Sequence, residues 1–248
     1  NPRAATGVFM TPFECTSRTH VGHKRKLNED ALLCSPADRI WAVADGMGGH
    51  EAGEVASQMV IAELAGLTPA DSLTMRVGKA IGALEAVNAA LIELAGSIGK
   101  DRTIGSTVVG LVTEGSELGC FWAGDSRALR LRGGEVTQIT RDHSLVQELV
   151  EAGMLEAERA DDHPNANILT RAVGAAKSLQ VDHVRGTVLA GDIYLLASDG
   201  LTRLVKPEEM VPILSGPVLE EAADRMLDLA LSRGASDNVS FVIVRFVS

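Results

Sequence analysis

Between residues 106 and 140 the chain has four short apolar runs in succession, and this region constrains the fold more than any other. The runs are rich in Val, Leu and Ile, and Gly133–Gly134 separates the last two. Paired glycines between two such runs indicate a hairpin, because glycine adopts the positive φ angles that tight turns need. We therefore expect successive antiparallel strands at Ser106–Thr113, Glu117–Ala123, Arg127–Arg132 and Glu135–Thr140.

Apolar periodicity predicts helices and further strands on both sides of this region. Apolar residues recur every three or four positions in Glu51–Ala65 and Ser72–Ala95, which is typical of one face of an amphipathic helix. Strands in hairpin series, with long helices gathered in two places, favour an α+β fold of antiparallel sheets covered by helices. The other expected helices are Ser144–Ala152 and Leu219–Ser232, and the other expected strands are Ala31–Leu33, Ile40–Ala44, Gln180–Val188, Ile193–Ala197 and Asn238–Phe246.

The chain length and composition favour one large domain. The sequence has 248 residues, of which 46% are hydrophobic, so a substantial core can form. We find no internal repeat, no low-complexity tract and no linker rich in Gly, Pro or Ser. The prediction is a single domain over residues 1–248, and we expect a monomer.

Charge and cysteine usage restrict the partners and the compartment. The formal net charge is −10, which argues against nucleic acid and against an anionic membrane surface as main partners. No signal segment is recognised, and no apolar run reaches the roughly 18 residues that span a membrane. The three cysteines form no Cys-x-x-Cys or Cys/His cluster, so neither a disulfide framework nor a structural zinc site is expected. These features favour a reducing, cytoplasmic location.

Four aspartates share one setting, in which each follows or opens an apolar strand beside small residues. They are Asp45, Asp125, Asp199 and Asp237. Converging carboxylates repel one another, and a hard divalent cation with oxygen ligands is the usual solution. An Asp-Gly pair is also an ordinary turn signal, but four such aspartates at strand ends favour a metal site.

A charged segment near the start of the chain contains two acids and a base, Arg25, Glu29 and Asp30. By itself such a run is usually a solvated surface. Beside the aspartate series it gains a role, because Glu29 and Asp30 can hold metal-bound waters. The planar guanidinium of Arg25 can bind two phosphate oxygens at once.

Seven ordered sequence blocks resemble the metal-dependent protein phosphatases, also called the protein phosphatase 2C family, and most closely its bacterial branch. The blocks follow the family's order and extend over residues 25–239, nearly the whole chain. They are Arg25-x-x-Asn28-Glu29-Asp30-Ala31, Val43-Ala-Asp-Gly-Met-Gly-Gly-His50, Thr103-Ile-Gly-Ser-Thr107, Ala123-Gly-Asp-Ser-Arg127, Leu169-Thr-Arg-Ala-Val-Gly174, Ala197-Ser-Asp-Gly-Leu201 and Ser236-Asp-Asn-Val239.

This resemblance implies a fold and a set of metal ligands. The fold would be a four-layer α-β-β-α sandwich of two antiparallel sheets flanked by helices, with a mobile flap near residues 144–167 and the metals at one end. Two core Mn²⁺ or Mg²⁺ ions and a weaker third ion are implied. Asp45 would bind both core ions, and the Gly46 carbonyl would bind one of them. Asp199 and Asp237 would complete the protein ligands of the first ion, and Glu29 and Asp30 would bind the second. Asp125 and Asp199 would hold the third.

The resemblance also implies an activity, which is hydrolysis of phosphoserine and phosphothreonine in proteins by a metal-activated water. Arg25 would bind the substrate phosphate, and Asp45 and Arg25 would be the catalytic residues. The partners would be phosphorylated proteins, with a serine/threonine kinase acting in opposition. In animal members a histidine directly follows the Asp-Gly pair as the proposed general acid. Here that position is Met47, so either the nearby His50 or a metal-bound water would protonate the leaving group.

Three other hypotheses are weighed against this one. An ATP-binding fold of the histidine-kinase and gyrase type would use loosely similar boxes at residues 28–31 and 45–48, but the spacing is too short and three aspartates stay unexplained. A catalytically inactive, phosphoprotein-binding phosphatase would be expected to lose a metal aspartate, and none is missing. A purely structural protein would leave the ordered acidic motifs as coincidence.

Overall fold

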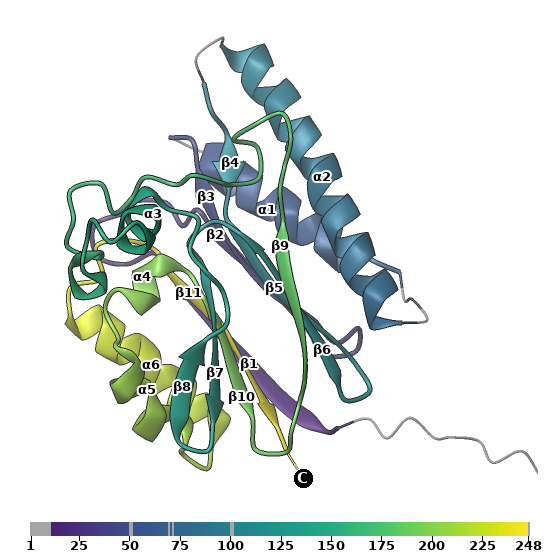
Figure 1. The fold of residues 1–248 in the computed structure, drawn as a ribbon, viewed down its shortest axis with the longest axis vertical. Helices are drawn as coiled ribbons and strands as arrows, with labels where there is room; N and C mark the ends of the chain where they lie inside the picture. Colours follow the sequence, from purple (N-terminus) through teal and green to yellow (C-terminus); the bar gives the residue numbers. More distant parts are fainter. Residues whose placement is uncertain (1–10, 50–51, 69, 71, 100–101, 248) are drawn as a thin grey trace, which may run out of the picture.

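A computed structural model of the chain describes residues 11–49, 52–68, 70, 72–99 and 102–247 (Figure 1). The helices of this part are α1 (Ala52–Ala65), α2 (Leu73–Ile98), α3 (Leu145–Glu151), α4 (Asp199–Thr202), α5 (Pro207–Leu214) and α6 (Leu219–Ser232), with a 3₁₀ turn at Ala157–Arg159. The strands are β1 (Phe13–His20), β2 (Asp30–Ser35), β3 (Ile40–Met47), β4 (Gly105–Ser106), β5 (Val108–Glu114), β6 (Glu117–Ala123), β7 (Arg127–Arg132), β8 (Glu135–Gln138), β9 (Asp182–Thr187), β10 (Ile193–Ala197) and β11 (Val239–Phe246).

These strands form two antiparallel sheets. One sheet has the order β1-β11-β10-β7-β8, and the other has the order β2-β3-β5-β6-β9, with β4 paired to the end of β3. The β5–β6 and β7–β8 pairs are hairpins, as the turn signals predict. The chain passes from one sheet to the other between β6 and β7, which places Asp125 at a crossing between the sheets.

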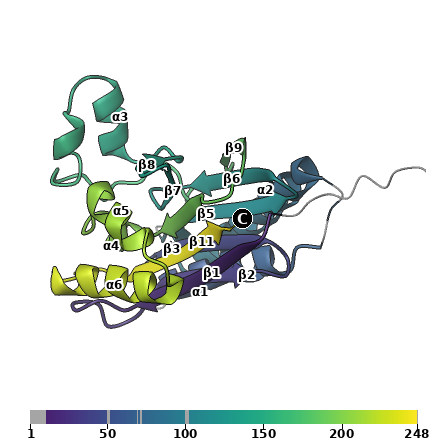
Figure 2. The same ribbon diagram turned by 90° about the horizontal axis from the view of Figure 1, so that it is seen from below.

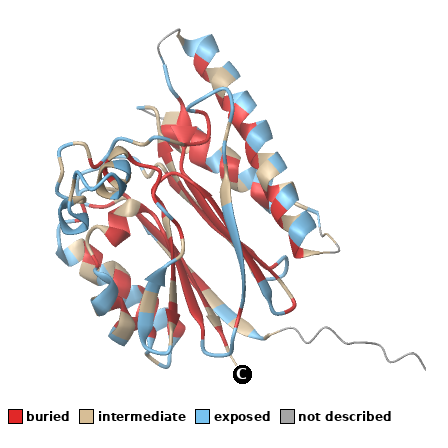
Figure 3. Ribbon diagram, viewed as in Figure 1, coloured by how far each residue is buried: buried red, intermediate tan, exposed pale blue. Residues whose placement is uncertain are grey.

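Three apolar layers hold the elements together and confirm the predicted four-layer sandwich. The first lies between the helices α1 and α2 and the face of the sheet that contains β3, β5 and β6. The second lies between α4–α6 and the sheet that contains β7, β10 and β11. The third lies between the two sheets and contains Trp41, Tyr194 and Phe246. Figure 1 shows the two helical groups on opposite sides of the sheets, and Figure 3 shows that burial is concentrated in the central strands of the sheets.

Several elements lie outside the sequence predictions. Strand β1 carries polar residues at most positions, yet it pairs with β11 over eight residues from Phe13 to His20, so the backbone ladder rather than apolar content defines it. β1 and β2 bring the Sγ atoms of Cys15 and Cys34 to 3.3 Å, although they belong to different sheets. The short helices α4 and α5 were also not predicted, because four and eight residues are too few for a clear period.

Helix α2 bears on the expectation that no apolar run reaches the roughly 18 residues that span a membrane. With 26 residues and a mean hydropathy of 1.4 in its best window, it is long and apolar enough by those two measures, and it is the one such helix in the described ranges. Its buried residues, among them Leu84, Val87 and Leu91, pack into the core against the sheet that contains β3, β5 and β6. The core helix of a globular domain passes the same test, so this is weak support for a membrane span. Ser72 caps its N-terminus, where the Ser72 side chain accepts a hydrogen bond from Met75 N.

The segment 144–167, expected to form the flap, consists of α3, the 3₁₀ turn and connecting loops. Figure 2 shows α3 and its loop projecting from the body of the sandwich. Ser144 caps α3 through its side chain, and Leu145 N donates to Ile168 O, so the two ends of the segment meet. His143 N donates to Gly124 O at 2.9 Å, and Ser144 and Ala166 line one small cavity with Asp125, so the segment begins and ends beside the turn that carries Asp125.

Candidate metal centre

The predicted site residues come from five separate parts of the chain and meet at one end of the sandwich. A cavity of about 260 Å³ there is lined by Arg25, Glu29, Asp45, Gly46, Asp125, Asp199 and Asp237. Asp30 is not in its lining, but it lies opposite Asp45 in the β2–β3 ladder and is buried directly behind it. The structure thus brings all eight predicted residues together, although they span more than 200 positions of sequence.

Asp45 lies at the centre of this group, and its backbone is fixed from both sides. Its N–H donates to Thr107 Oγ1 at 3.0 Å, and its carbonyl accepts from Thr107 N at 2.8 Å and from Ser106 Oγ at 3.1 Å. Burial raises the pKa of the Asp45 carboxyl well above its usual range, and the neighbouring charges of Asp30 and Asp199 raise it further. A carboxylate held rigidly in such a place needs a nearby cation to remain ionised.

Glycines allow α1 to approach the end of β3. A Cβ at Gly46 would lie 1.9 Å from Gly53 O and 2.7 Å from Glu29 O, and a Cβ at Gly53 would lie 2.3 Å from Glu29 Oε1. Gly46 N also donates to Glu29 O at 3.0 Å. A side chain at Gly46 would collide with backbone atoms, and one at Gly53 would displace the Glu29 carboxylate, so the two glycines let that carboxylate lie beside the end of β3.

Two carboxylate oxygens in the group are buried without a hydrogen-bond donor. Among the residues that the structure describes, Glu29 Oε1 and Asp30 Oδ1 have no donor, whereas Asp30 Oδ2 accepts from Ser198 Oγ at 3.0 Å. Burial raises the pKa of Asp30 to about 7 in spite of hydrogen bonds from Ser240 and Ser198. Buried acceptors are normally satisfied, so these oxygens indicate a ligand that the protein itself does not supply.

Asp237 lies at the mouth of the cavity, in the turn before β11. Its Oδ2 accepts from Arg25 Nη2 at 2.8 Å, and Arg25 Nη1 lies 4.0 Å from Glu29 Oε2. Asn238 fixes this turn to the β1–β2 loop, since its Oδ1 accepts from Glu29 N at 2.8 Å and its Nδ2 donates to Leu27 O at 3.0 Å. The Arg25 side chain remains 48% exposed and faces solvent at the opening.

Asp125 and Asp199 form the far wall of the cavity. Burial raises the pKa of Asp125 to about 7, and the charge of Asp199 adds to this. Burial also raises the pKa of Asp199, which Arg203 partly offsets. Arg203 Nη2 lies 3.0 Å from Asp199 Oδ2 and 3.7 Å from Asp125 Oδ2.

These residues fit hard divalent cations. Every donor is an oxygen, two donor oxygens lack partners, and the carboxylates outnumber the nearby arginines. Within the described ranges, no three Asp, Glu, His or Cys side chains already converge on one ion position. Arg25 and Arg203 hold Asp237 and Asp199 in ion pairs instead.

Sequence reasoning missed the residues that position the carboxylates. Thr107, Ser198 and Asn238 lie within the recognised blocks but had no assigned role. The sequence feature that could have indicated them is a short polar side chain next to a motif aspartate or in the neighbouring strand. Met47 lies at the end of β3 and lines the cavity, whereas His50 lies outside the described residues.

Known proteins resemble this chain over most of its length. Serine/threonine protein phosphatase PstP of Mycobacterium tuberculosis is 38% identical over 234 residues, covering 93% of this chain. This chain spans 44% of the length of that relative. Among solved structures, one described as PppA, a key regulatory component of T6SS in Pseudomonas aeruginosa, aligns with a TM-score of 0.89 at 40% identity, covering 96% of this chain and 99% of that one.

A second solved structure, the catalytic domain of PstP in complex with two manganese ions, aligns with a TM-score of 0.85 at 37% identity, covering 95% of this chain and 99% of that one. The sequence profile of protein phosphatase 2C matches residues 18–232. That match covers all the proposed site residues except Asp237, and the solved relatives share both sheets. The chain belongs to the protein phosphatase 2C family.

Proposed function

We propose that this chain is a Mn²⁺- or Mg²⁺-dependent phosphatase that removes phosphate from phosphoserine and phosphothreonine in proteins. The observation that carries the proposal is the buried carboxylate cluster with an arginine at its mouth, in a chain of this family. The manganese-bound relative supports the same metal chemistry. The complete set of aspartates supports an active enzyme over an inactive phosphoprotein-binding module.

The chain would hold two core ions and a weaker third ion. Asp45 and the Gly46 carbonyl, with Asp199 and Asp237, would hold the first, and Glu29, Asp30 and Asp45 would hold the second, partly through water. Asp125 and Asp199 would hold the third. When bound, such ions supply Lewis-acid chemistry and lower the pKa of a coordinated water.

The protein's own groups would bind and orient the substrate. Arg25 can turn its guanidinium from Asp237 toward a phosphate ester at the opening, because half of the side chain is exposed. Thr107 and Asn238 keep the Asp45 and Asp237 turns in place during this exchange. The Arg25 guanidinium would thus neutralise part of the charge that develops on the phosphate oxygens.

The biological setting follows from the relatives and from composition. We expect one domain over residues 1–248, a monomer in the cytoplasm, with phosphoproteins as substrates and a serine/threonine kinase in opposition. The similarity to a regulatory component of T6SS supports a regulatory role rather than a metabolic one.

The most direct test is hydrolysis of a phosphothreonine peptide. We expect turnover with added Mn²⁺, weaker or comparable turnover with Mg²⁺, and none in EDTA. Full turnover in metal-free buffer containing EDTA would overturn the proposal. Radiolabelled ATP binding without phosphatase activity would instead support the ATP-binding alternative.

A further inference from the structure

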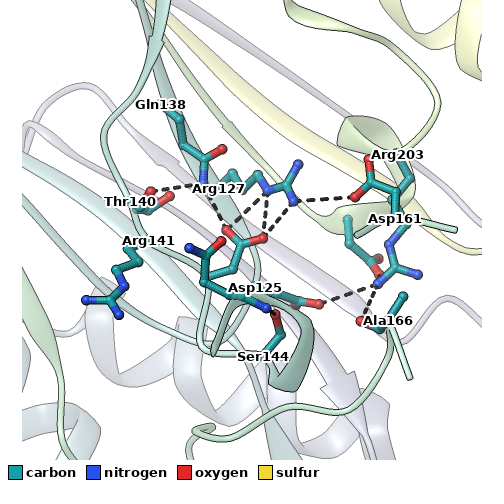
Figure 4. A network of polar contacts seen from close by, with 12 residues as sticks. Asp125, Arg127, Gln138, Thr140, Arg141, Ser144, Asp161, Ala166 and Arg203 are labelled. Carbon is teal, nitrogen blue, oxygen red and sulfur yellow. Dashed lines mark hydrogen bonds and ion pairs between the residues drawn. The ribbon is translucent and has the colours of Figure 1, made fainter. Parts of the chain in front are cut away.

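Arg203 connects the carboxylates of the site to the flap. It follows Asp199 by one helical turn at the end of α4, and its Nη2 lies near Asp199 Oδ2 and Asp125 Oδ2. The same guanidinium donates to the flap, from Nη2 to Ala166 O at 3.2 Å and from Nη1 to Asn167 Oδ1. Figure 4 shows Arg203 between Asp125 and Ala166. One side chain therefore joins the proposed third-ion ligands to the last residues of the flap.

The space around this guanidinium is small. A cavity of only about 30 Å³ lies there, lined by Asp125, Asp199, Arg203 and the flap residues Asp161 and Ala166. Such a volume holds roughly one or two waters. A divalent ion that takes oxygens from both Asp125 and Asp199 would stand against the guanidinium, and the two positive charges would repel each other.

A second contact joins the flap to the core, but it does not involve the metal ligands. Arg127 Nη2 lies 2.7 Å from Asp142 Oδ2 and 3.7 Å from Asp161 Oδ1 in the flap, and Lys206 Nζ lies 3.1 Å from Asp161 Oδ2. Gln138 Nε2 supports Asp142 at 2.9 Å. Arg127 is held in this contact by Asp142, which is not a proposed metal ligand. An ion at Asp125 and Asp199 would therefore leave the contact in place. Of these two contacts, the Arg203 contact is the one that shares its carboxylates with a proposed metal site.

We propose that Arg203 is an internal cation that takes the place of the third metal ion at Asp125 and Asp199 and holds the C-terminal end of the flap to the site. Binding of the third ion displaces the guanidinium from the two carboxylates and loosens residues 160–167. This inference rests on the proposed metal site, and it makes Arg203 a positioning residue rather than a catalytic one.

The coupling must act in both directions. If the third ion loosens the flap by removing Arg203 from the carboxylates, then a held flap must weaken the third ion by the same factor. Coupling between two sites in a protein is typically 5- to 150-fold. The third ion would therefore bind weakly in the parent because it has to replace a charge that is already in place.

The test uses the full chain with Arg203→Gln, which removes the charge but keeps a polar side chain. Arg225→Gln is the matched control, because Arg225 is exposed on α6 and its loss changes the net charge equally. Calorimetric titration with Mn²⁺ should show that both variants still bind the two tight ions. The weak ion should bind about tenfold more tightly in Arg203→Gln and as in the parent in the control.

Hydrogen exchange supplies a readout that does not depend on activity. With only the two tight Mn²⁺ sites filled, peptides covering residues 160–168 should exchange about tenfold faster in Arg203→Gln than in the parent. Filling the weak site should accelerate these peptides in the parent and leave the variant unchanged. Arg203→Lys, which keeps the charge without the planar fork, should lie between the two and serves as the second variant if Arg203→Gln unfolds.

Three outcomes would overturn the inference. They are a weak-site affinity that is independent of Arg203, flap exchange that is equal in parent and variant, and flap exchange in the parent that ignores the third ion. A chain that binds no Mn²⁺ at all would instead overturn the proposed function. Two intact tight sites with a weak site and flap that do not respond to Arg203 would overturn this inference alone.

Discussion

Buried aspartates lie at both ends of the paired strands β7 and β10, but the two ends differ in how much positive charge surrounds the carboxylates. At one end Asp192 is 1% exposed and has an arginine of its own, because Arg132 Nε and Nη2 each lie 2.6 Å from one of its oxygens. Leu189 N adds a third donor at 2.8 Å. At the other end Asp125 and Asp199 share the single guanidinium of Arg203, at 3.7 and 3.0 Å.

This difference separates a structural carboxylate from one that is kept for an external cation. Asp142, near the site but held in a bidentate pair by Arg127, resembles Asp192. Asp30, Asp45 and Asp125 instead have raised pKa values, since burial and neighbouring carboxylates are not offset by enough positive charge. The number of arginines that pair with each buried carboxylate therefore distinguishes the two kinds of site within one protein.

Asp45→Asn should have the largest effect. It removes the charge that both core ions would share, so the tight Mn²⁺ sites should be lost together with at least about 10²-fold of the turnover. Calorimetric titration with Mn²⁺ and hydrolysis of a phosphothreonine peptide measure the two effects. A variant that binds Mn²⁺ like the parent would show that the cluster is not a metal site and would remove the contrast between the two ends.

The chelated protein should lose stability as pH rises. Asp30 and Asp125 have folded pKa values of about 7 against an ordinary value of 3.8. A carboxyl with a raised folded pKa stabilises the fold fully below its unfolded pKa, and that contribution disappears as pH rises through about 7. The charged side chains that face these two groups are Asp45, Asp142, Asp199, Asp237, Arg127 and Arg203.

Thermal unfolding in EDTA at pH 5 and pH 7.5 measures this effect. We expect a Tm at least roughly 5 °C lower at the higher pH, since one pKa unit corresponds to about 1.4 kcal/mol. Saturating Mn²⁺ should remove most of the difference, because bound ions replace the protons. An equal pH dependence with and without Mn²⁺ would mean that the carboxylates are not the groups responsible.

Asp192→Ala tests the opposite end of the same strands. It should destabilise the fold by about 2 kcal/mol, because Arg132 loses its partner and Leu189 N loses its acceptor. Arg132 is partly exposed, so water compensates in part. Chemical denaturation measures the loss, and Mn²⁺ titration should show unchanged tight sites. Weakened metal binding in this variant would argue against two independent ends.

The sequence predicts the strands of the β5–β8 region closely because apolar alternation and glycine turns are local signals. β6 and β7 have the predicted bounds, as do β10 and α6. β1 was missed because its stability depends on a partner more than 200 residues away, and that pairing leaves no local apolar pattern. Which strands form which sheet also depends on such long-range pairing and was not predicted, whereas the expectation of two sheets came from the family resemblance.

The carboxylates of the site were predictable, whereas their supports were not. Each aspartate lies in a recognisable strand-end motif, and the structure brings these motifs together. Asn238 and Ser198 act across sheets and loops, so a single sequence does not reveal their partners. Arg203 was missed for the same reason, because its contacts with Asp125 and Ala166 depend on tertiary packing.

Arg25→Ala should have the smallest effect and separates substrate binding from metal binding at the mouth of the site. Arg25 is half-exposed, so its ion pair with Asp237 is screened by water and contributes little to stability. Its loss should raise KM for a phosphopeptide by about tenfold, since a bidentate phosphate contact disappears, while the ions would still activate the water. Steady-state kinetics with saturating Mn²⁺ measures KM, and Mn²⁺ titration measures the metal affinity.

Tight Mn²⁺ affinity and Tm should stay close to the parent values in Arg25→Ala. Arg25→Lys should restore only part of the lost substrate affinity, because a single ammonium lacks the planar fork. Collapse of metal binding in Arg25→Ala would instead make Arg25 a structural partner of Asp237, as Arg132 is of Asp192.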